Sequence, residues 1–393
     1  MVIECTESPD LARAESWEAF PLAWSAAHED LLGPLSEPAD PAVAEFYARR
    51  KATLDLRILV SRMAPAALEG NGVDEAIYLR GDPANRGASA ARAAPELIRA
   101  AGAGVARQPA SAGTSGRLAL AHAVTAPDNP LTARVWANRL WLQLFGRGLA
   151  PDPDNVGLLG RPPTHPELLD WLADRLVRVH HWHTKPLLRE LVLSRTFRAS
   201  STPLAVSAEQ DPLNLLWHRY PVRRLESEDL RDAVLAASGR LDLAMSGPSV
   251  PVFLTDFMEG RGRPALSGPM DGSGRRSLYV ELRRNFLDPL LLAFDFPTPF
   301  TTIGKRSVSN VPAQALALMN DPLLDELSEA WATRLYFEPR SPRERLDRAW
   351  KQAFARAPDP GEIALCEEFL DDGGELSSLL HALLQAKEFQ FVF

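Results

Sequence analysis

Apolar residues three or four positions apart mark most of the chain after residue 116 as helical. The clearest stripe follows Thr164, and shorter ones occupy 184–192 and 376–389. Side chains at this spacing lie on one face of a helix, so the pattern predicts amphipathic helices packed on a shared core. In the first stripe the residues on one face are Leu168, Leu172, Leu176 and Val179.

Capping residues set the expected helix boundaries. Asn129 before Pro130 predicts a helix start, and Gly146 predicts its end. Thr164 and Glu167 have the spacing of a capping box, in which each side chain bonds the backbone N–H of the other residue. The same spacing recurs at Ser341 and Glu344 and at Asp359 and Glu362.

Two short segments break the helical pattern. Residues 74–83 read as a strand closed by a turn, and 276–284 alternate between apolar and polar positions. In the second segment Leu278, Val280 and Leu282 are expected on one face. The predicted fold class is mainly α, a multi-helix globular domain with a small β element around 74–83 and 276–284.

The chain is expected to divide into four parts. Residues 1–70 form an N-terminal segment, a remnant of an upstream domain or a linker, and 71–100 form a short β-containing segment. Residues 101–116, AGAGVARQPASAGTSG, have the composition of a flexible linker. The main helical domain is expected to span 117–393.

Composition narrows the class of protein. With 46% hydrophobic and 24% charged residues, the 393-residue chain has an ordinary globular mixture. A net charge of −8 argues against nucleic-acid binding, which depends on neutralising phosphates. No run of 18 apolar residues occurs, so no membrane span is expected.

Cysteine usage and the first residues bear on cofactor and compartment. Cys5 and Cys366 form neither a CxxC nor a CxxCH motif, so no cofactor is expected in this chain. The opening MVIECTESPD lacks the basic and apolar regions of a signal peptide. Taken literally, the sequence predicts a cytoplasmic protein; a fragment that has lost an exported N-terminus is the alternative.

A charge run opens the helix expected over 226–238. Glu226, Glu228 and Asp229 crowd its first turn. Acidic side chains are favourable there because they face the positive end of the helix dipole. Paired carboxylates also serve as acid and base in glycoside hydrolysis. Both interpretations of the run stay open, and charge capping is the simpler one.

Arginines bracket the segment 276–284. A convergent cluster with Arg283, Arg284 and Asn285 would suit a carboxylate, sulfate or phosphate group. Alternation along a strand instead sends Arg283 and Arg284 to opposite faces. The structural alternative is that one arginine of each pair forms an ion pair with Asp295 or Glu281.

Histidines supply two further candidates. His165 would be a general base only if a substrate proton came within hydrogen-bond reach, and the capping box at Thr164 already explains its surroundings. The run His180-His181-Trp182-His183 offers imidazoles for a metal. Adjacent side chains diverge, so a helix–helix turn with Trp182 packed inward is the simpler interpretation. We expect no metal site.

Several segments together resemble one family. They include NPLTARVWANRLWLQLFGRGL (129–149), RPPTHPELLDWLA (161–173), RRLESEDLRDAVLAASGRLD (223–242), RRSLYVELRRNFLDPLLLAFDFP (275–297) and VPAQALALMND (311–321). In order and spacing, they resemble the planctomycete-type C-terminal domain of unknown function, a PSD-type family found downstream of cytochrome c domains in large exported proteins. The resemblance covers roughly 74–393.

The resemblance implies a location and neighbouring domains rather than a particular reaction. It implies a cell-envelope or periplasmic location, an upstream cytochrome c domain as partner, and haem c only on that partner or on a missing upstream domain. It also implies a glycan as a possible ligand. The polar residues carried over as a candidate polar and anion-binding cluster are His165, Glu167, Arg224, Glu226, Arg231, Arg283, Arg284, Asn285 and Asp295.

Three hypotheses for function follow. The favoured one is a scaffold or interaction module stabilised by arginine–carboxylate pairs. The second is a hydrolase of polysaccharide or another anionic polymer, with Arg283 or Arg284 holding the anion and His165 or Glu226 as acid and base. The third is an accessory domain in extracytoplasmic electron transfer, which needs a haem partner. Whether the chain is an enzyme stays open from its sequence.

Overall fold

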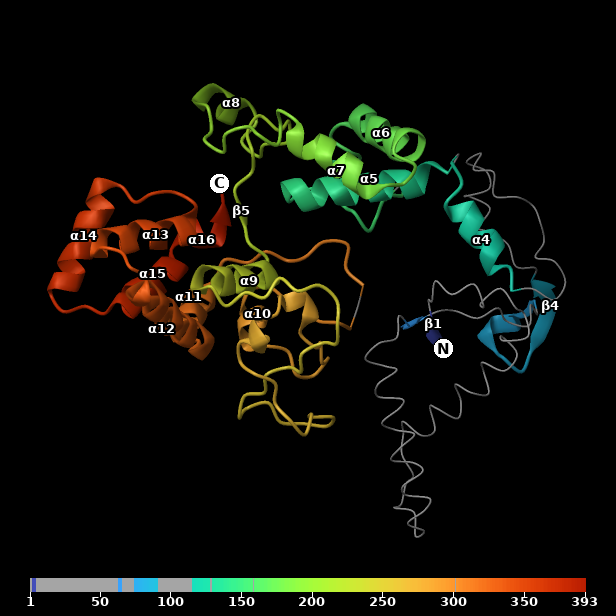
Figure 1. The fold of residues 1–393 in the computed structure, drawn as a ribbon. Helices are drawn as coiled ribbons and strands as arrows, with labels where there is room; N and C mark the ends of the chain where they lie inside the picture. Colours follow the sequence, from blue (N-terminus) through green and yellow to red (C-terminus); the bar gives the residue numbers. More distant parts are fainter. Residues whose placement is uncertain are drawn as a thin grey trace, which may run out of the picture. The chain divides into compact units, whose positions relative to one another are not determined.

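The computed structural model describes residues 2–4, 63–65, 74–90, 115–127, 129–157, 159–300 and 302–393. Throughout this part of the chain helices dominate and strands are short, which confirms the mainly α fold class (Figure 1). The chain forms two compact units, one made of 1–96 and 106–122 and the other of 97–105 and 123–393. Most of the predicted linker 101–116 and of the N-terminal segment 1–70 lies outside the described residues.

The first unit holds the predicted β element at 74–83. Strand β3 (Glu75–Tyr78) pairs antiparallel with β4 (Arg86–Ala90), and the 3-10 turn η2 (Leu79–Gly81) joins them. A second antiparallel pair consists of β1 (Val2–Glu4) and β2 (Met63–Pro65). Helix α4 (Arg117–Val124) begins after Gly116 and has no buried residue.

In the second unit, the first of two large cores forms around helix α5 (Pro130–Phe145). Helix α6 (Pro166–Asp174), the π-helical turn η3 (Arg175–Val179) and helix α7 (Thr184–Leu193) pack on it. Trp141 and Phe145 stack at 4.2 Å between ring centroids, and Trp217 meets both edge-on. The apolar stripe predicted after Thr164 is buried here through Leu172 and Leu176. A short helix α8 (Ala205–Gln210) follows.

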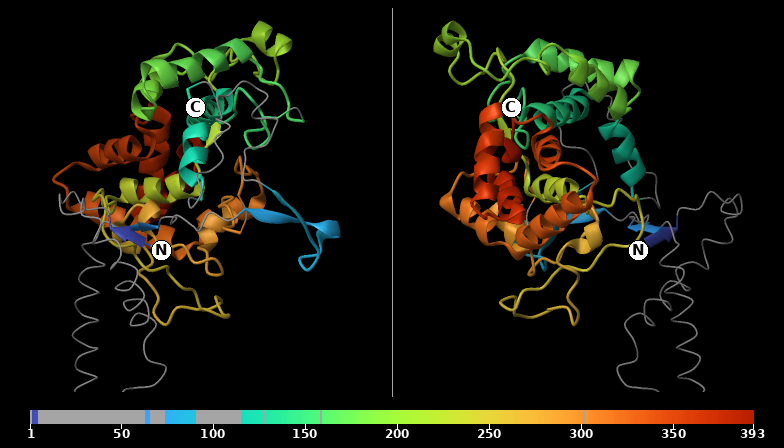
Figure 2. Two further views of the ribbon diagram at one scale, coloured as in Figure 1. Left: turned by 90° about the vertical axis from the view of Figure 1, so that its right-hand side faces the viewer. Right: turned by 60° about the vertical axis from the view of Figure 1, so that its left-hand side comes forward.

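The second core gathers the C-terminal helices. Helix α9 (Ser227–Ser238) packs on α12 (Pro322–Phe337), which packs on α15 (Leu376–Gln385). Figure 2 shows the C-terminal helices side by side in both views. The remaining helices are α10 (Pro289–Ala293), α11 (Pro312–Asn320), α13 (Pro342–Phe354), α14 (Pro360–Asp371) and α16 (Lys387–Gln390).

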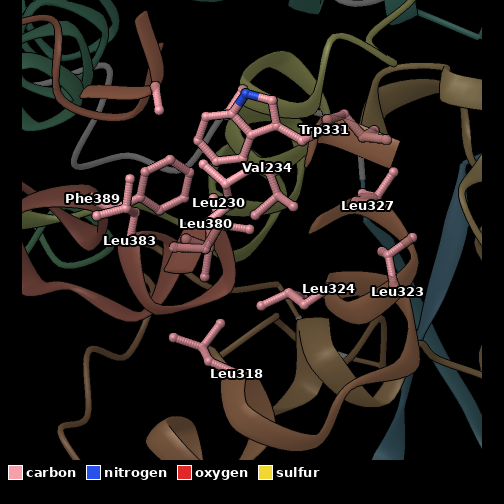
Figure 3. Close-up of a cluster of buried hydrophobic side chains, with 14 of the residues drawn as sticks. Leu230, Val234, Leu318, Leu323, Leu324, Leu327, Trp331, Leu380, Leu383 and Phe389 are labelled. Carbon is pink, nitrogen blue, oxygen red and sulfur yellow. The ribbon is translucent and has the colours of Figure 1, made fainter. Parts of the chain in front are cut away.

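Trp331 is the largest fully buried side chain of this second core among the described residues. Its indole is fully buried among leucines of α9, α12 and α15, as the close-up shows (Figure 3). Its ring N–H donates to the side-chain oxygen of Gln352 at 2.8 Å. The core therefore buries a large aromatic ring without leaving its one polar atom unsatisfied.

A two-residue ladder joins the chain end to the segment before α9. Strand β5 (Arg223–Arg224) pairs antiparallel with β6 (Phe391–Val392). Arg223 also donates to the carbonyl of Gln143 in α5, and the Tyr220 hydroxyl donates to the carbonyl of Leu144. These contacts tie the α5 core to the segment that leads into the second core.

Most predicted helix ends are confirmed, and one is wrong. Asn129 caps α5 and Gly146 ends it with a positive φ of 71°. The capping boxes at Ser341 and Asp359 form. The box expected at Thr164 does not, because Thr164 bonds the carbonyl of Leu149 instead and the N-cap lies one residue later, at His165.

The second predicted strand is also wrong in its detail. Residues 277–279 form a 3-10 turn, and beyond it only single bridges occur, such as Val250 with Val280. The expected burial is inverted, since Leu278 is 73% exposed while Ser277 is buried. Ser277 is buried because it bonds Asp232 and Arg231, and these polar contacts outweigh the apolar alternation.

An ion-pair cluster near the chain end predicts acid sensitivity. Arg356 bonds Glu362 and Glu388, and its hydrogen bonds lower the pKa of Glu362 to about 2. A carboxyl whose folded pKa lies below its usual value stabilises the fold above that value, and this stabilisation disappears as the pH falls towards the folded pKa. We expect Glu362→Gln to flatten the loss of stability between about pH 5 and about pH 2.

Denaturant midpoints measured across that pH range check this prediction. Glutamine keeps the capping box with Asp359, so the variant removes the charge and not the helix start. Lys351→Gln, in an exposed i,i+4 ion pair of α13, is the control and should leave the slope unchanged. Equal slopes for the wild type and Glu362→Gln would contradict the prediction.

Candidate functional site

The buried pair of Arg224 and Asp295 is the strongest contact among the candidate residues. The Arg224 Nη2 donates to Asp295 Oδ2 at 2.5 Å, and the side chains are only 6% and 16% exposed. Asp295 also accepts from the backbone N–H and the hydroxyl of Ser309. Burial alone raises the pKa of Asp295, but the Ser309 N–H and the Arg224 guanidinium outweigh it and hold the pKa below its usual value.

Arg231 is held by backbone carbonyls rather than exposed to a ligand. It is 3% exposed and donates to the carbonyls of Asp271 and Arg275 and to the hydroxyl of Ser277. Burial lowers the pKa of its guanidinium. Helix α9 is thereby joined to the loop that precedes the 3-10 turn η5 (Ser277–Tyr279).

Glu226 belongs to a separate group of charges at the start of α9. Arg306 contacts Glu226 at 3.2 Å and forms a double contact with Glu228. Burial, with the neighbouring Asp229 and Glu228, raises the pKa of Glu226 against the pull of Arg306. Burial and Glu228 likewise raise the pKa of Asp229, whereas the bond from Arg306 keeps that of Glu228 low.

The predicted charge run lies at the start of the helix as expected, although the Glu226 side chain makes no capping hydrogen bond. Glu226 is the N-cap, and Glu228 and Asp229 lie in the first turn. The residue that organises them, Arg306, was not singled out in the sequence, because it follows 78 positions after Glu228 and no local pattern links the two. The segment 302–309 brings it there.

Arg283, Arg284 and Asn285 lie on an exposed turn. Arg283 pairs with Glu281 at 2.7 Å, as one of the two expected partners, but stays 48% exposed. Arg284 lies over the Phe300 ring at 5.2 Å, and Asn285 is exposed. Asp295 is not their partner, because Arg224 occupies it.

His165 and Glu167 are distant in sequence from the charges at α9 and lie at the start of α6, outside the α5 core. The His165 ring contacts the Thr164 hydroxyl at 3.0 Å, and Glu167 is exposed on the first turn of α6. Among the nine candidate residues, all of which the structure describes, one pair is joined by a hydrogen bond or ion pair, Arg224 with Asp295. The other seven bond residues outside the candidate set or none in the described part of the chain.

The histidine run forms the expected turn between helices. His181 and Trp182 both have positive φ, and Trp182 packs against the α5 core. His180 contacts Glu190, which also pairs with Arg175. Among the residues the structure describes, no three histidine, cysteine or acidic side chains are placed to hold a metal ion together.

A buried amide fixes the loop after α5. Asn138 is 1% exposed, donates to the carbonyl of Ala150 at 3.0 Å and accepts from its N–H at 2.9 Å. Removing the side chain leaves two buried backbone groups unpaired. We expect Asn138→Ala to lower the free energy of unfolding by about 2–3 kcal/mol.

Chemical denaturation of the purified variant measures this cost. Asn320→Ala removes an amide that bonds one carbonyl at the exposed end of α11, and it should cost less than about 0.5 kcal/mol. If both substitutions lower the free energy of unfolding equally, the bonds between Asn138 and Ala150 do not hold the loop.

Comparison with known protein families identifies the family to which the chain belongs. The model of PSD1, a family described as a protein of unknown function (DUF1553), matches residues 116–370. The chain belongs to this family. The PSD1 match begins beside α4 and ends within α14, so it covers the α5 core and most of the second core, but not helices α15 and α16. No curated protein and no solved structure matches the chain.

No helix in the described part of the chain is long and apolar enough to cross a membrane. The PSD1 match does not assign a reaction, so the residues themselves must carry any proposal about function.

Proposed function

We propose that this PSD1 domain is an interaction module, in which the candidate charged residues hold the fold and an apolar surface binds a partner domain. One observation carries the proposal: the charged candidates are divided among separate local contacts. Arg224 is bound by Asp295, Arg231 by backbone carbonyls and Glu226 by Arg306. A catalytic centre instead needs such groups within reach of one bond.

The irregular segment 243–308 supports a partner surface. Ten of its large apolar side chains are exposed, and exposed apolar side chains that gather on one surface often mark a site of protein–protein interaction. The exposed residues are Leu243, Met245, Phe257, Leu266, Leu278, Leu282, Leu292, Phe300, Ile303 and Val308. Phe257 is 95% exposed and Leu266 is 80% exposed.

A c-type cytochrome domain is the partner we propose. We base this choice on the resemblance to exported planctomycete-type proteins, which implies an upstream cytochrome c domain in the cell envelope. Exposed arginines on the same segment would suit a partner with acidic groups around its contact surface. Arg261 and Arg284 are exposed there, and Arg283 is half-exposed. Haem would reside on the partner, and electron transfer would be the partner's chemistry.

Calorimetric titration with a c-type cytochrome domain from the same locus tests the proposal. We expect the double variant Leu278→Asp/Leu282→Asp to weaken binding by at least about tenfold, because two buried leucines at an interface contribute several kcal/mol. Leu204→Asp, a 72% exposed leucine outside the segment, is the matched control. Absence of binding, or equal binding by both variants, would refute the proposal.

Hydrolysis is the second candidate, because Glu226 and Asp229 both have raised pKa values beside Arg306. A carboxyl with a raised pKa stays protonated to a higher pH than an ordinary carboxyl, which favours a role as a general acid. An assay for reducing ends released from dextran sulfate and from neutral dextran tests the hydrolase hypothesis. Activity abolished by Glu226→Gln but kept by the exposed variant Glu167→Gln would favour the hydrolase over the interaction module.

A further inference from the structure

A pocket of about 490 Å³ opens between α5, α6 and the loop that joins them. Its apolar lining includes Leu131, Val156, Pro163 and Leu169. This volume lies within the range of small-ligand sites, which combine apolar walls with a few polar groups. None of the residues that line the pocket belongs to the exposed segment 243–308, which forms the proposed partner surface.

Hydrogen bonds within the protein brace the walls of the pocket. Asn138 clamps Ala150 with two hydrogen bonds, and both residues line the pocket. The loop is closed where the Arg161 N–H and guanidinium bond Asp152. A pocket with fixed walls binds without the cost of ordering a loop.

Two glycines of the loop leave the space open. A Cβ on Gly160 would lie 1.8 Å from the carbonyl oxygen of Asn155, so this position must be glycine. A Cβ on Gly157 meets only the Asn155 side chain, at 3.9 Å, and Gly157 has no left-handed φ. A larger residue at 157 is therefore tolerated by the backbone, and because Gly157 lines the pocket, we expect its side chain to reduce the space there.

Arginines give the lining its polar groups. Arg134 bonds Asp170 through Nε at 2.5 Å, and none of the hydrogen bonds in the described part of the chain uses its two terminal nitrogens. Arg161 binds Asp152 through Nε and Nη2, and its Nη1 has no hydrogen-bond partner among the residues that the structure describes. Guanidinium N–H groups beside apolar walls suit a planar carboxylate or sulfonate.

We propose that this pocket binds a small organic anion, with an apolar body against the leucine and proline walls and an acidic group on Arg134 and Arg161. The apolar part of the ligand contacts the pocket wall formed by α5 and α6. The acidic group binds guanidinium nitrogens without displacing a hydrogen bond within the protein. Asp152 and Asp170 balance the two guanidinium charges, so the apolar body supplies a large part of the affinity.

Ligand-observed NMR with naphthalene-2-carboxylate tests the proposal, with the neutral naphthalene-2-carboxamide as its comparison. We expect one equivalent of the carboxylate to bind about tenfold more tightly than the amide, since a hydrogen bond to a charged group contributes about that factor. Gly157→Leu should abolish binding by filling the pocket.

Two arginine variants separate this site from general charge effects. Arg134→Met should weaken carboxylate binding about tenfold, while Arg178→Met, which breaks an exposed ion pair with Asp174, should leave it unchanged. Thermal unfolding confirms that each variant is folded. No binding, equal binding of acid and amide, or insensitivity to Gly157→Leu in a folded protein would overturn the proposal without touching the cytochrome titration.

Discussion

Asp295→Ala is expected to lower the free energy of unfolding by about 3–5 kcal/mol, among the largest costs for any single charged residue in the chain. The substitution leaves Arg224, 6% exposed, as a buried cation without its carboxylate. It also leaves the Ser309 N–H without its acceptor. Breaking a buried pair costs far more than the pair contributes over an apolar replacement.

Urea unfolding at neutral pH measures the effect. Asp295 has a φ of +62°, which asparagine tolerates better than alanine, so Asp295→Asn separates the lost charge from backbone strain. Asp170→Ala is the control, because it breaks a pair whose side chains are 41% and 52% exposed and should cost at most about 1 kcal/mol. Similar costs for Asp295→Ala and Asp170→Ala would contradict the account.

Trp331→Ala is expected to cost about 3–5 kcal/mol by opening a cavity in the second core. The indole is fully buried against α9 and α15, so no solvent or side chain can fill the space cheaply (Figure 3). Gln352 also loses its indole partner. We expect the thermal midpoint to fall by several degrees and the protein to become prone to unfolding at low denaturant.

The matched control for this cavity lies on the same helix. Tyr336 in α12 is 64% exposed, and Tyr336→Ala should cost less than about 1 kcal/mol. Urea unfolding measures the stability of both variants. An unchanged dependence of the free energy of unfolding on urea concentration verifies two-state behaviour. A Trp331→Ala cost near that of Tyr336→Ala would show that the core is not built around the indole.

Helix positions were predictable because their signals are local. Asn129 and Gly146 bound α5, and the boxes at Ser341 and Asp359 set the starts of α13 and α14, all within four residues of the groups they bond. The failure at Thr164 shows the limit. A distant carbonyl, that of Leu149, competes for the same side chain, and sequence spacing does not reveal it.

The partners of the charged residues were harder to predict. The contact between Glu228 and Arg306 spans 78 positions, and that between Arg224 and Asp295 spans 71. The sequence suggested an ion pair between Asp295 and Arg283 or Arg284, but in the structure Asp295 pairs with Arg224. Likewise, alternation over 277–283 favoured burial of Leu278, whereas the hydrogen bonds of Ser277 bury the opposite side.

The central claim is that the charged candidates hold the fold rather than await a substrate. A double-mutant cycle with Arg224→Met and Asp295→Asn tests it most directly, because it measures the coupling of the pair apart from the single costs. The account predicts a coupling of at least about 2 kcal/mol in the folded protein. A coupling near zero, with each single variant as stable as the wild type, would leave both groups free for a ligand and contradict the claim.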